Sequence, residues 1–166
     1  MPERKTIERA RRDKREGKAA STQAGEFVRE EIEHIREGKH GARSSAQAIA
    51  IGLSKARRAG VKLPAPKQGT TSEKTRRSAQ RDLAAGEKPS AAVSPKRSRA
   101  TTSALKREGK AAASKSALAR QARAAAGERS ASERSASAQK AARTKGPAER
   151  SAAAQKAART RARSGS

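Results

Sequence analysis

The sequence predicts a mainly α-helical protein, in which a short helical hairpin module precedes a tail that is largely disordered or conditionally helical. Three observations predict this. Leu, Ile, Val and Phe number only 14 among 166 residues, and nine of them lie between Phe27 and Leu63. Alanine, the strongest helix former, occurs 39 times. Lys and Arg outnumber the acids by 41 to 16, and such a charge with so few apolar residues leaves little burial to offset chain entropy.

Capping residues and apolar spacing place the first two helices at about 4–16 and 22–37. The first is highly charged and has Ile7 as its apolar anchor, so it is marginal by itself in water. The second ends at Gly38, a natural helix stop. Its apolar residues fall on one side at helical spacing: Ala24, Phe27, Val28, Ile32 and Ile35.

The third predicted helix covers residues 45–59 and is capped by Ser44 or Ser45. Its apolar stripe comprises Ala46, Ile49, Leu53 and Ala56. Gly52 predicts the close approach of a neighbouring helix. Ile51 points to the other side, which indicates a second contact or self-association.

The module therefore covers residues 1–66, with Pro64 and Pro66 marking its exit. A hairpin of about 40 residues rarely stands alone. We expect support from a homodimer formed through the 22–59 hairpin, from the first helix, or from nucleic acid.

The tail, residues 67–166, is low in complexity and contains a 16-residue repeat. The stretch 133–144 recurs with little change as 149–160. These repeats have almost no apolar residues to stack, so they do not suit a solenoid. They suit a multivalent cationic tail that is open when free and gains helix when phosphates neutralise its charge.

Enzyme and cofactor signatures are weak throughout. The chain has no cysteine, which excludes disulfides and zinc–thiolate sites. Three Gly-Lys pairs, at 17–18, 38–39 and 109–110, lack the rest of a phosphate-binding loop. We expect no enzymatic activity and no cofactor.

The two histidines, His34 and His40, stand six residues apart with several glutamates nearby. A metal site needs ligands converging on one point, which one helix does not supply across Gly38. We therefore expect a solvated helix face here and no metal site.

The net charge of +25 points to a polyanionic partner. Residues 42–68 carry six bases and no acid, and residues 69–166 carry 24 bases against seven acids. We expect phosphate contacts from bases in both stretches. These are Arg43, Lys55, Arg57, Arg58, Lys62, Lys96, Arg97, Arg99, Lys140, Arg143, Lys156 and Arg159.

The sequence favours duplex DNA over RNA. Proteins that bind single strands stack bases on aromatic rings, and Phe27 is the sole Phe, Trp or Tyr and is expected in the core. Two alternatives remain: an RNA- or ribosome-associated basic protein, and an adaptor that docks a protein through the 22–59 hairpin. With no apolar stretch long enough for a membrane span and no signal-peptide core, we expect a cytoplasmic protein at the nucleoid and no membrane partner.

Two resemblances accompany these residues. The tail resembles the Ala/Lys-rich tails of linker histones and bacterial histone-like proteins, including their Ser-Pro-basic-basic motif at Ser94-Pro95-Lys96-Arg97. The front, through STQAGEFVREEIEH at 21–34 and QAIAIGLSKARRAG at 47–60, resembles a family of small, basic bacterial proteins of uncharacterised function that carry generic DNA-binding labels. The resemblances imply a bacterial, nucleoid-associated protein with a shared helical module.

Overall fold

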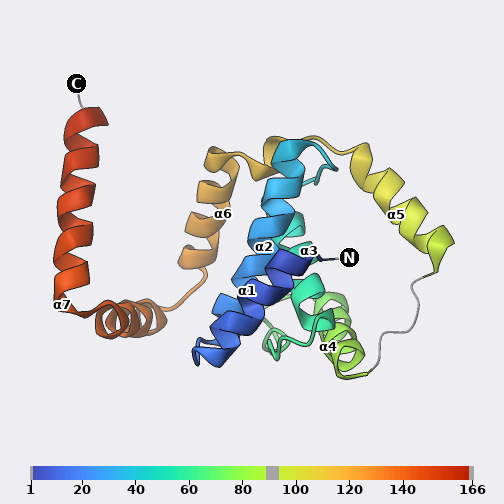
Figure 1. Ribbon diagram of the computed structural model, residues 1–166, viewed down its shortest axis with the longest axis horizontal. Coiled ribbons are helices and arrows are strands. Elements are labelled where there is room, and N and C mark those ends of the chain that lie inside the picture. Colours follow the sequence, from blue (N-terminus) through green and yellow to red (C-terminus); the bar gives the residue numbers. More distant parts are fainter. Residues whose placement is uncertain (1, 89–93, 165–166) are drawn as a thin grey trace. The chain divides into compact units, whose positions relative to one another are not determined.

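The computed structural model describes residues 2–88 and 94–164, and every regular element in that described part is helical (Figure 1). This confirms the mainly α class. The chain divides into two compact units, residues 1–121 and 122–166, with the boundary inside α6. In chain order the elements are α1 (Arg4–Arg15), α2 (Ala20–Glu37), α3 (Ser45–Arg58), α4 (Glu73–Glu87), α5 (Pro95–Lys106), the 3-10 turn η1 (Ala111–Ala113), α6 (Lys115–Gly127) and α7 (Ala131–Ser164).

The three predicted helices of the module are present. Helices α1 and α2 begin without a side-chain cap, at Arg4 and Ala20, so the second starts two residues before its predicted position. The end of α2 and the start of α3 follow the expected local chemistry. Gly38 closes α2 in the left-handed conformation at φ 80°, which glycine adopts without steric cost. The Ser44 side chain caps α3 by accepting a hydrogen bond from the Gln47 amide at 3.1 Å. These two caps end α2 and begin α3, so that the chain between them turns and α3 packs along α2.

Helices α2 and α3 pack closely at Gly52. A Cβ atom there would lie 2.6 Å from Val28 Cα, so only glycine fits and the predicted close approach is confirmed. The predicted apolar stripe of α3 is confirmed only in part: Ala56 is buried and Leu53 packs against the Phe27 cluster, whereas Ala46 is exposed. The buried face of α3 consists of Ser45, Ala48, Gly52, Ala56 and Arg57. Small side chains let the two backbones approach, and the larger Ile49 and Leu53 are displaced to partly buried positions.

Two small apolar clusters hold the first unit together. Phe27, 1 % exposed, packs with alanines of α1, α2 and α3 and with Val61. Ile32 and Ile35 pack with Ala42 and Ala48 and with two alanines of η1. The hairpin is therefore supported within one chain by α1 and by residues 111–113.

Helix α4 adds a further layer on α3. Its buried residues are Ala79 and Asp82, and a Cβ atom on Gly86 would lie 2.0 Å from the Arg57 carbonyl oxygen. Asp82 accepts hydrogen bonds from Ser54 Oγ at 2.6 Å and from Arg58 Nε at 2.7 Å. The packed unit therefore extends well past the predicted boundary at residue 66.

The prediction of a largely disordered tail is not supported, because the described part of the tail is helical up to Ser164. Alanine's helix propensity is the physical reason in α7, and tertiary packing adds to it in α4 and η1. Gly146 interrupts α7 with φ 63° and ψ 168°, and Pro147 follows. The two repeats, 133–144 and 149–160, thus lie in separate helical segments on either side of this break.

Candidate nucleic-acid interface

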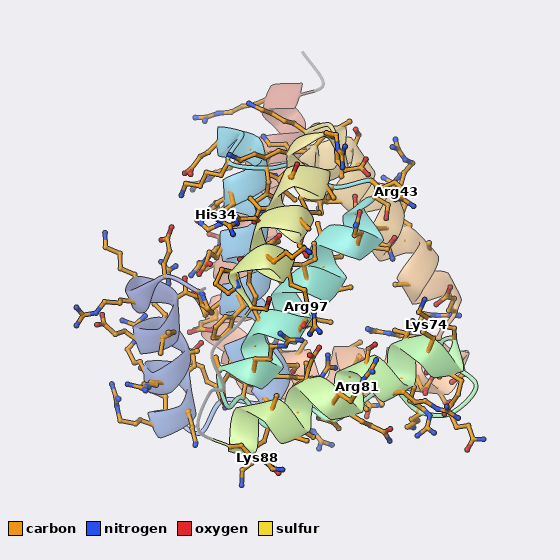
Figure 2. The ribbon with its side chains drawn as sticks, turned by 90° about the vertical axis from the view of Figure 1, so that its right-hand side faces the viewer. His34, Arg43, Lys74, Arg81, Lys88 and Arg97 are labelled. Atoms are coloured by element: carbon orange, nitrogen blue, oxygen red, sulfur yellow. The ribbon has the colours of Figure 1, made fainter. Side chains whose placement is uncertain are left out.

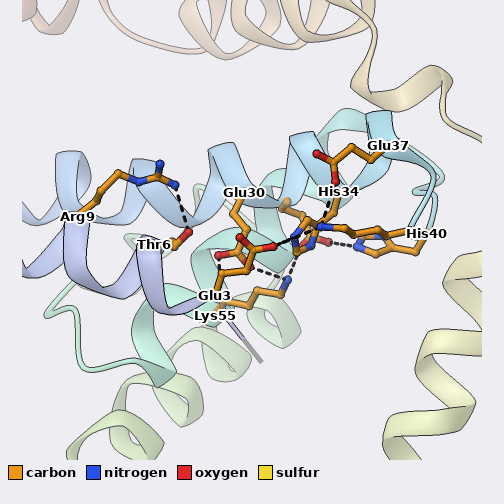
Figure 3. A network of polar contacts seen from close by, with 10 residues as sticks. Glu3, Thr6, Arg9, Glu30, His34, Glu37, His40 and Lys55 are labelled. Carbon is orange, nitrogen blue, oxygen red and sulfur yellow. Dashed lines mark hydrogen bonds and ion pairs between the residues drawn. The ribbon is translucent and has the colours of Figure 1, made fainter.

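Lys55 lies in a polar network inside the first unit instead of facing solvent (Figure 3). Its Nζ is 2.5 Å from Glu31 Oε2 and 3.7 Å from Glu30 Oε1. Both carboxylates are almost wholly buried, at 0 % and 2 % exposure. Removing one partner would leave an uncompensated buried charge, so the structure supports an internal role for Lys55 rather than a phosphate contact.

Arg57 is also used internally. It is 6 % exposed, and its guanidinium donates to the carbonyl oxygens of Leu63 and Pro64, each at 3.1 Å. Burial lowers the pKa of this group from its ordinary value. The Arg57 side chain therefore holds the segment after α3 against that helix. This structural role explains the arginine without any contact to a phosphate.

The remaining expected bases of residues 42–68 are accessible to different degrees. Arg43 is 81 % exposed, with Glu108 Oε1 at 3.6 Å from its Nε. Arg58 is 61 % exposed but paired with Asp82 at 2.7 Å. Lys62 is exposed in the loop that follows α3. Of the three, Arg43 and Lys62 are presented most directly to solvent.

The sequence interpretation overlooked a basic face on α4. Lys74, Arg77 and Arg81 are exposed and recur at helical spacing. Figure 2 shows Lys74 and Arg81 along this helix, with the exposed Lys88 directly after its last residue. The three bases within the helix lie opposite Ala79, Asp82 and Gly86, the side that packs on α3. The signal that could have located this face is the cap at Ser72 together with this spacing of the bases.

Partners on α4 leave much of this charge accessible. Arg77 is 72 % exposed, and its Nε lies 3.2 Å from Glu73 Oε1. Arg76 pairs with the same carboxylate. Arg81 donates to Ser78 Oγ at 3.0 Å. From Lys74 to Arg81 the helix rises about 10 Å, which equals about three base-pair steps measured along the axis of a DNA duplex.

The expected bases of the tail all lie on exposed helix surfaces. Lys96, Arg97 and Arg99 occupy the first turns of α5, where Pro95 stands at the helix start (Figure 2). Lys140 and Arg143 lie in the first segment of α7, and Lys156 and Arg159 hold the matching positions in the second. Each pair is three residues apart and therefore shares a helix face.

Within residues 2–88 and 94–164, the helices are too short or too polar to cross a membrane. Comparison with protein-family models, with curated proteins and with solved structures gives no match to this chain.

Proposed function

We propose that the protein binds duplex DNA without catalysing a reaction, by neutralising phosphates in the manner of a histone-like, nucleoid-associated protein. The observation that carries this proposal is the basic face of α4. Its three bases Lys74, Arg77 and Arg81 project from a helix whose other side is anchored on α3. Anchoring matters because a pre-positioned set of cations loses less freedom on binding than a flexible chain does.

The bases of α5 and α7 add further exposed cations to those of the α4 face. Lysine and arginine release condensed counterions when they contact phosphates, so exposed bases add affinity regardless of base sequence. The two α7 repeats supply the same exposed basic pattern twice. This supports a protein that binds along a duplex through several separate contacts.

Duplex DNA is favoured over single-stranded RNA by the position of Phe27. It is the one Phe, Trp or Tyr in the chain and is 1 % exposed in the core. No such ring is therefore presented for stacking on unpaired bases. Recognition through the A-form RNA backbone is the alternative, and competition between duplex DNA and duplex RNA of equal length distinguishes the two.

The first test is duplex binding by the full-length protein across a salt series. Log affinity is expected to fall linearly with log salt, with about 0.9 of slope for each phosphate contacted. A shallow slope, or affinity that is insensitive to salt, would overturn the proposal. The search would then move to a protein partner for the hairpin.

A triple variant tests the α4 face itself. Lys74→Gln, Arg77→Gln and Arg81→Gln together should lower the slope by up to about 2.7, because up to three contacts are lost. The matched control removes three bases from α1, Lys5→Gln, Arg12→Gln and Arg15→Gln. Equal losses in the two variants would mean that net charge alone drives binding and that α4 is not a defined interface.

The homodimer expected through the 22–59 hairpin stays a prediction. Within one chain, α1, α4 and η1 already pack against α2 and α3, which supplies the support that dimerisation was expected to give. Sedimentation equilibrium of the full-length protein decides it. A nucleoid location in the cell remains part of this proposal and is tested by co-localisation with DNA.

A further inference from the structure

We propose that Glu31, His34 and His40 form a binding site for a divalent transition-metal ion of the zinc class. One ligand atom of each residue lies within 4.8 Å of those of the other two. The sequence interpretation placed no metal here, because one helix does not bring ligands together across Gly38. The left-handed Gly38 instead reverses the chain, so that His40 returns to α2 (Figure 3). This inference does not depend on DNA binding.

The hydrogen bonds of His40 leave one ring nitrogen available as a ligand. Its Nδ1 lies 3.1 Å from the Gly41 carbonyl oxygen, which accepts only, so Nδ1 carries the proton. The neutral ring therefore has its lone pair on Nε2. Metal-binding histidines are commonly oriented in this way, with the second nitrogen donating to a backbone carbonyl or a carboxylate.

Glu31 presents an oxygen to that lone pair. Its Oε1 lies 3.3 Å from His40 Nε2, and among the described residues it accepts no well-formed hydrogen bond. Two lone pairs facing each other inside the protein repel unless a proton or a metal cation lies between them, so this pair of atoms is suited to hold a cation. The 3.3 Å separation is also close to the ~3.3 Å edge of a tetrahedron of ligands 2.0–2.1 Å from zinc.

His34 completes the set from the next turn of α2. Glu31 and His34 are three residues apart and share a helix face. Glu3 Oε1 accepts a hydrogen bond from His34 Nε2 at 2.8 Å, which orients the ring and leaves the lone pair of the neutral imidazole on Nδ1. The His34 and His40 ring centroids are 6.1 Å apart. Binding requires the three ligand atoms, which lie within 4.8 Å of one another, to close to the spacing of about 3.3 Å found around zinc.

The charge of the buried network favours a cation. Glu30 and Glu31 are both buried, and Lys55 is the ammonium group that reaches both of them. With neutral histidines, two carboxylates thus face one ammonium, and one negative charge is left over. Two imidazoles and one carboxylate suit zinc, whereas magnesium and calcium require more oxygen ligands.

The test is zinc titration of the full-length protein, first freed of metal with a chelator, by calorimetry at pH 7.5. One equivalent is expected to bind, and Co²⁺ should give the absorption of a tetrahedral site. His40→Gln and His34→Gln should each weaken zinc binding by at least about 100-fold, since loss of orienting partners alone costs 10–100-fold. The matched control Glu33→Gln, an exposed acid on the same helix, should bind as the wild type does.

A second measurement keeps the proposal falsifiable if a variant unfolds. The chain has only two histidines, so its imidazole ¹⁵N signals belong to these ligands alone. Zinc should shift His40 Nε2 and leave Nδ1 protonated. If zinc does not bind, or binds without shifting these signals, the site is not a metal site.

Discussion

The first unit buries part of its basic charge, whereas the described bases of the second unit stay exposed even where, as at Arg134 and Arg150, they donate to backbone carbonyls. In residues 1–121, Lys55, Arg57 and Arg58 are tied to buried acids or backbone carbonyls. In residues 122–164, every described basic side chain is exposed. The difference follows from the apolar content, since no Leu, Ile, Val or Phe occurs after Leu118. Without an apolar core, a helix has nothing to bury a lysine or arginine against.

The largest expected effect is on the first unit alone. Phe27→Ala removes the largest side chain of one apolar cluster and should cost about 3–5 kcal/mol of unfolding free energy, because the cavity collapses only in part. Urea denaturation followed by circular dichroism measures the loss. The helix of the second unit should remain in the spectrum of the variant, and its disappearance would show that the two units fold as one.

The next effect concerns the second unit alone. Replacing Lys140, Arg143, Lys156 and Arg159 by glutamine should reduce the salt slope of DNA binding by up to about 3.6. The urea midpoint of the first unit should not change, because these side chains lie in the second unit. A lower midpoint with an unchanged slope would reverse the roles assigned to the two units.

Two glycine substitutions in the hairpin, one at a close helix contact and one in open space, test the packing of α2 on α3. Gly52→Ala forces α2 and α3 apart and should destabilise the first unit by about 1–3 kcal/mol. Gly25→Ala, in the same hairpin with open space around the added carbon, should stabilise it by roughly 0.5–1 kcal/mol. Changes of the same sign in both variants would contradict the close helix contact.

Arg57 and Lys62 test whether a base stabilises the fold or contacts DNA. Arg57→Gln leaves the Leu63 and Pro64 carbonyls without their donor and should cost about 1–3 kcal/mol of stability. Lys62→Gln should leave stability within about 0.5 kcal/mol and reduce the salt slope by about 0.9. Denaturation and DNA titration of both variants check the assignment, which fails if Arg57→Gln reduces the slope and Lys62→Gln does not.

The smallest effect is expected at Glu73, which Arg76 and Arg77 share. The hydrogen bond from Arg76 lowers the pKa of Glu73 below its ordinary 4.5. Its contribution to the stability of α4 is therefore present above that pH and is lost as the pH falls through the lowered pKa. At neutral pH, Glu73→Gln releases both arginines and should raise DNA affinity about two- to fivefold. Unchanged affinity would show that they do not reach phosphate.

The sequence predicted what depends on local patterns and missed what depends on distant partners. The apolar spacing of α2, its end at Gly38 and the contact at Gly52 could all be predicted, and Ser44 was one of the two caps expected for α3. Helix α4 was missed as a packed element, because it is anchored by Ala79 and Gly86 and has Leu83 as its one large apolar residue.

In the candidate site, too, local features could be predicted from the sequence and long-range contacts could not. The exposed bases of α5 and α7 follow from composition, and the structure leaves them on helix surfaces. The internal role of Lys55 depends on Glu31, which is 24 residues away, and the proposed metal site depends on a chain reversal at Gly38. No pattern of spacing within one helix encodes either of these contacts.

The break at Gly146 and Pro147 has a kinetic consequence for the proposed DNA complex. Because each repeat lies in its own helical segment, one repeat can leave the phosphates while the other still holds the duplex. A competing duplex or a second protein molecule can then occupy the vacated phosphates before the first repeat returns. Residence time on DNA should therefore shorten as the concentration of free competitor rises, so that the protein is handed from one duplex to another without passing through free solution.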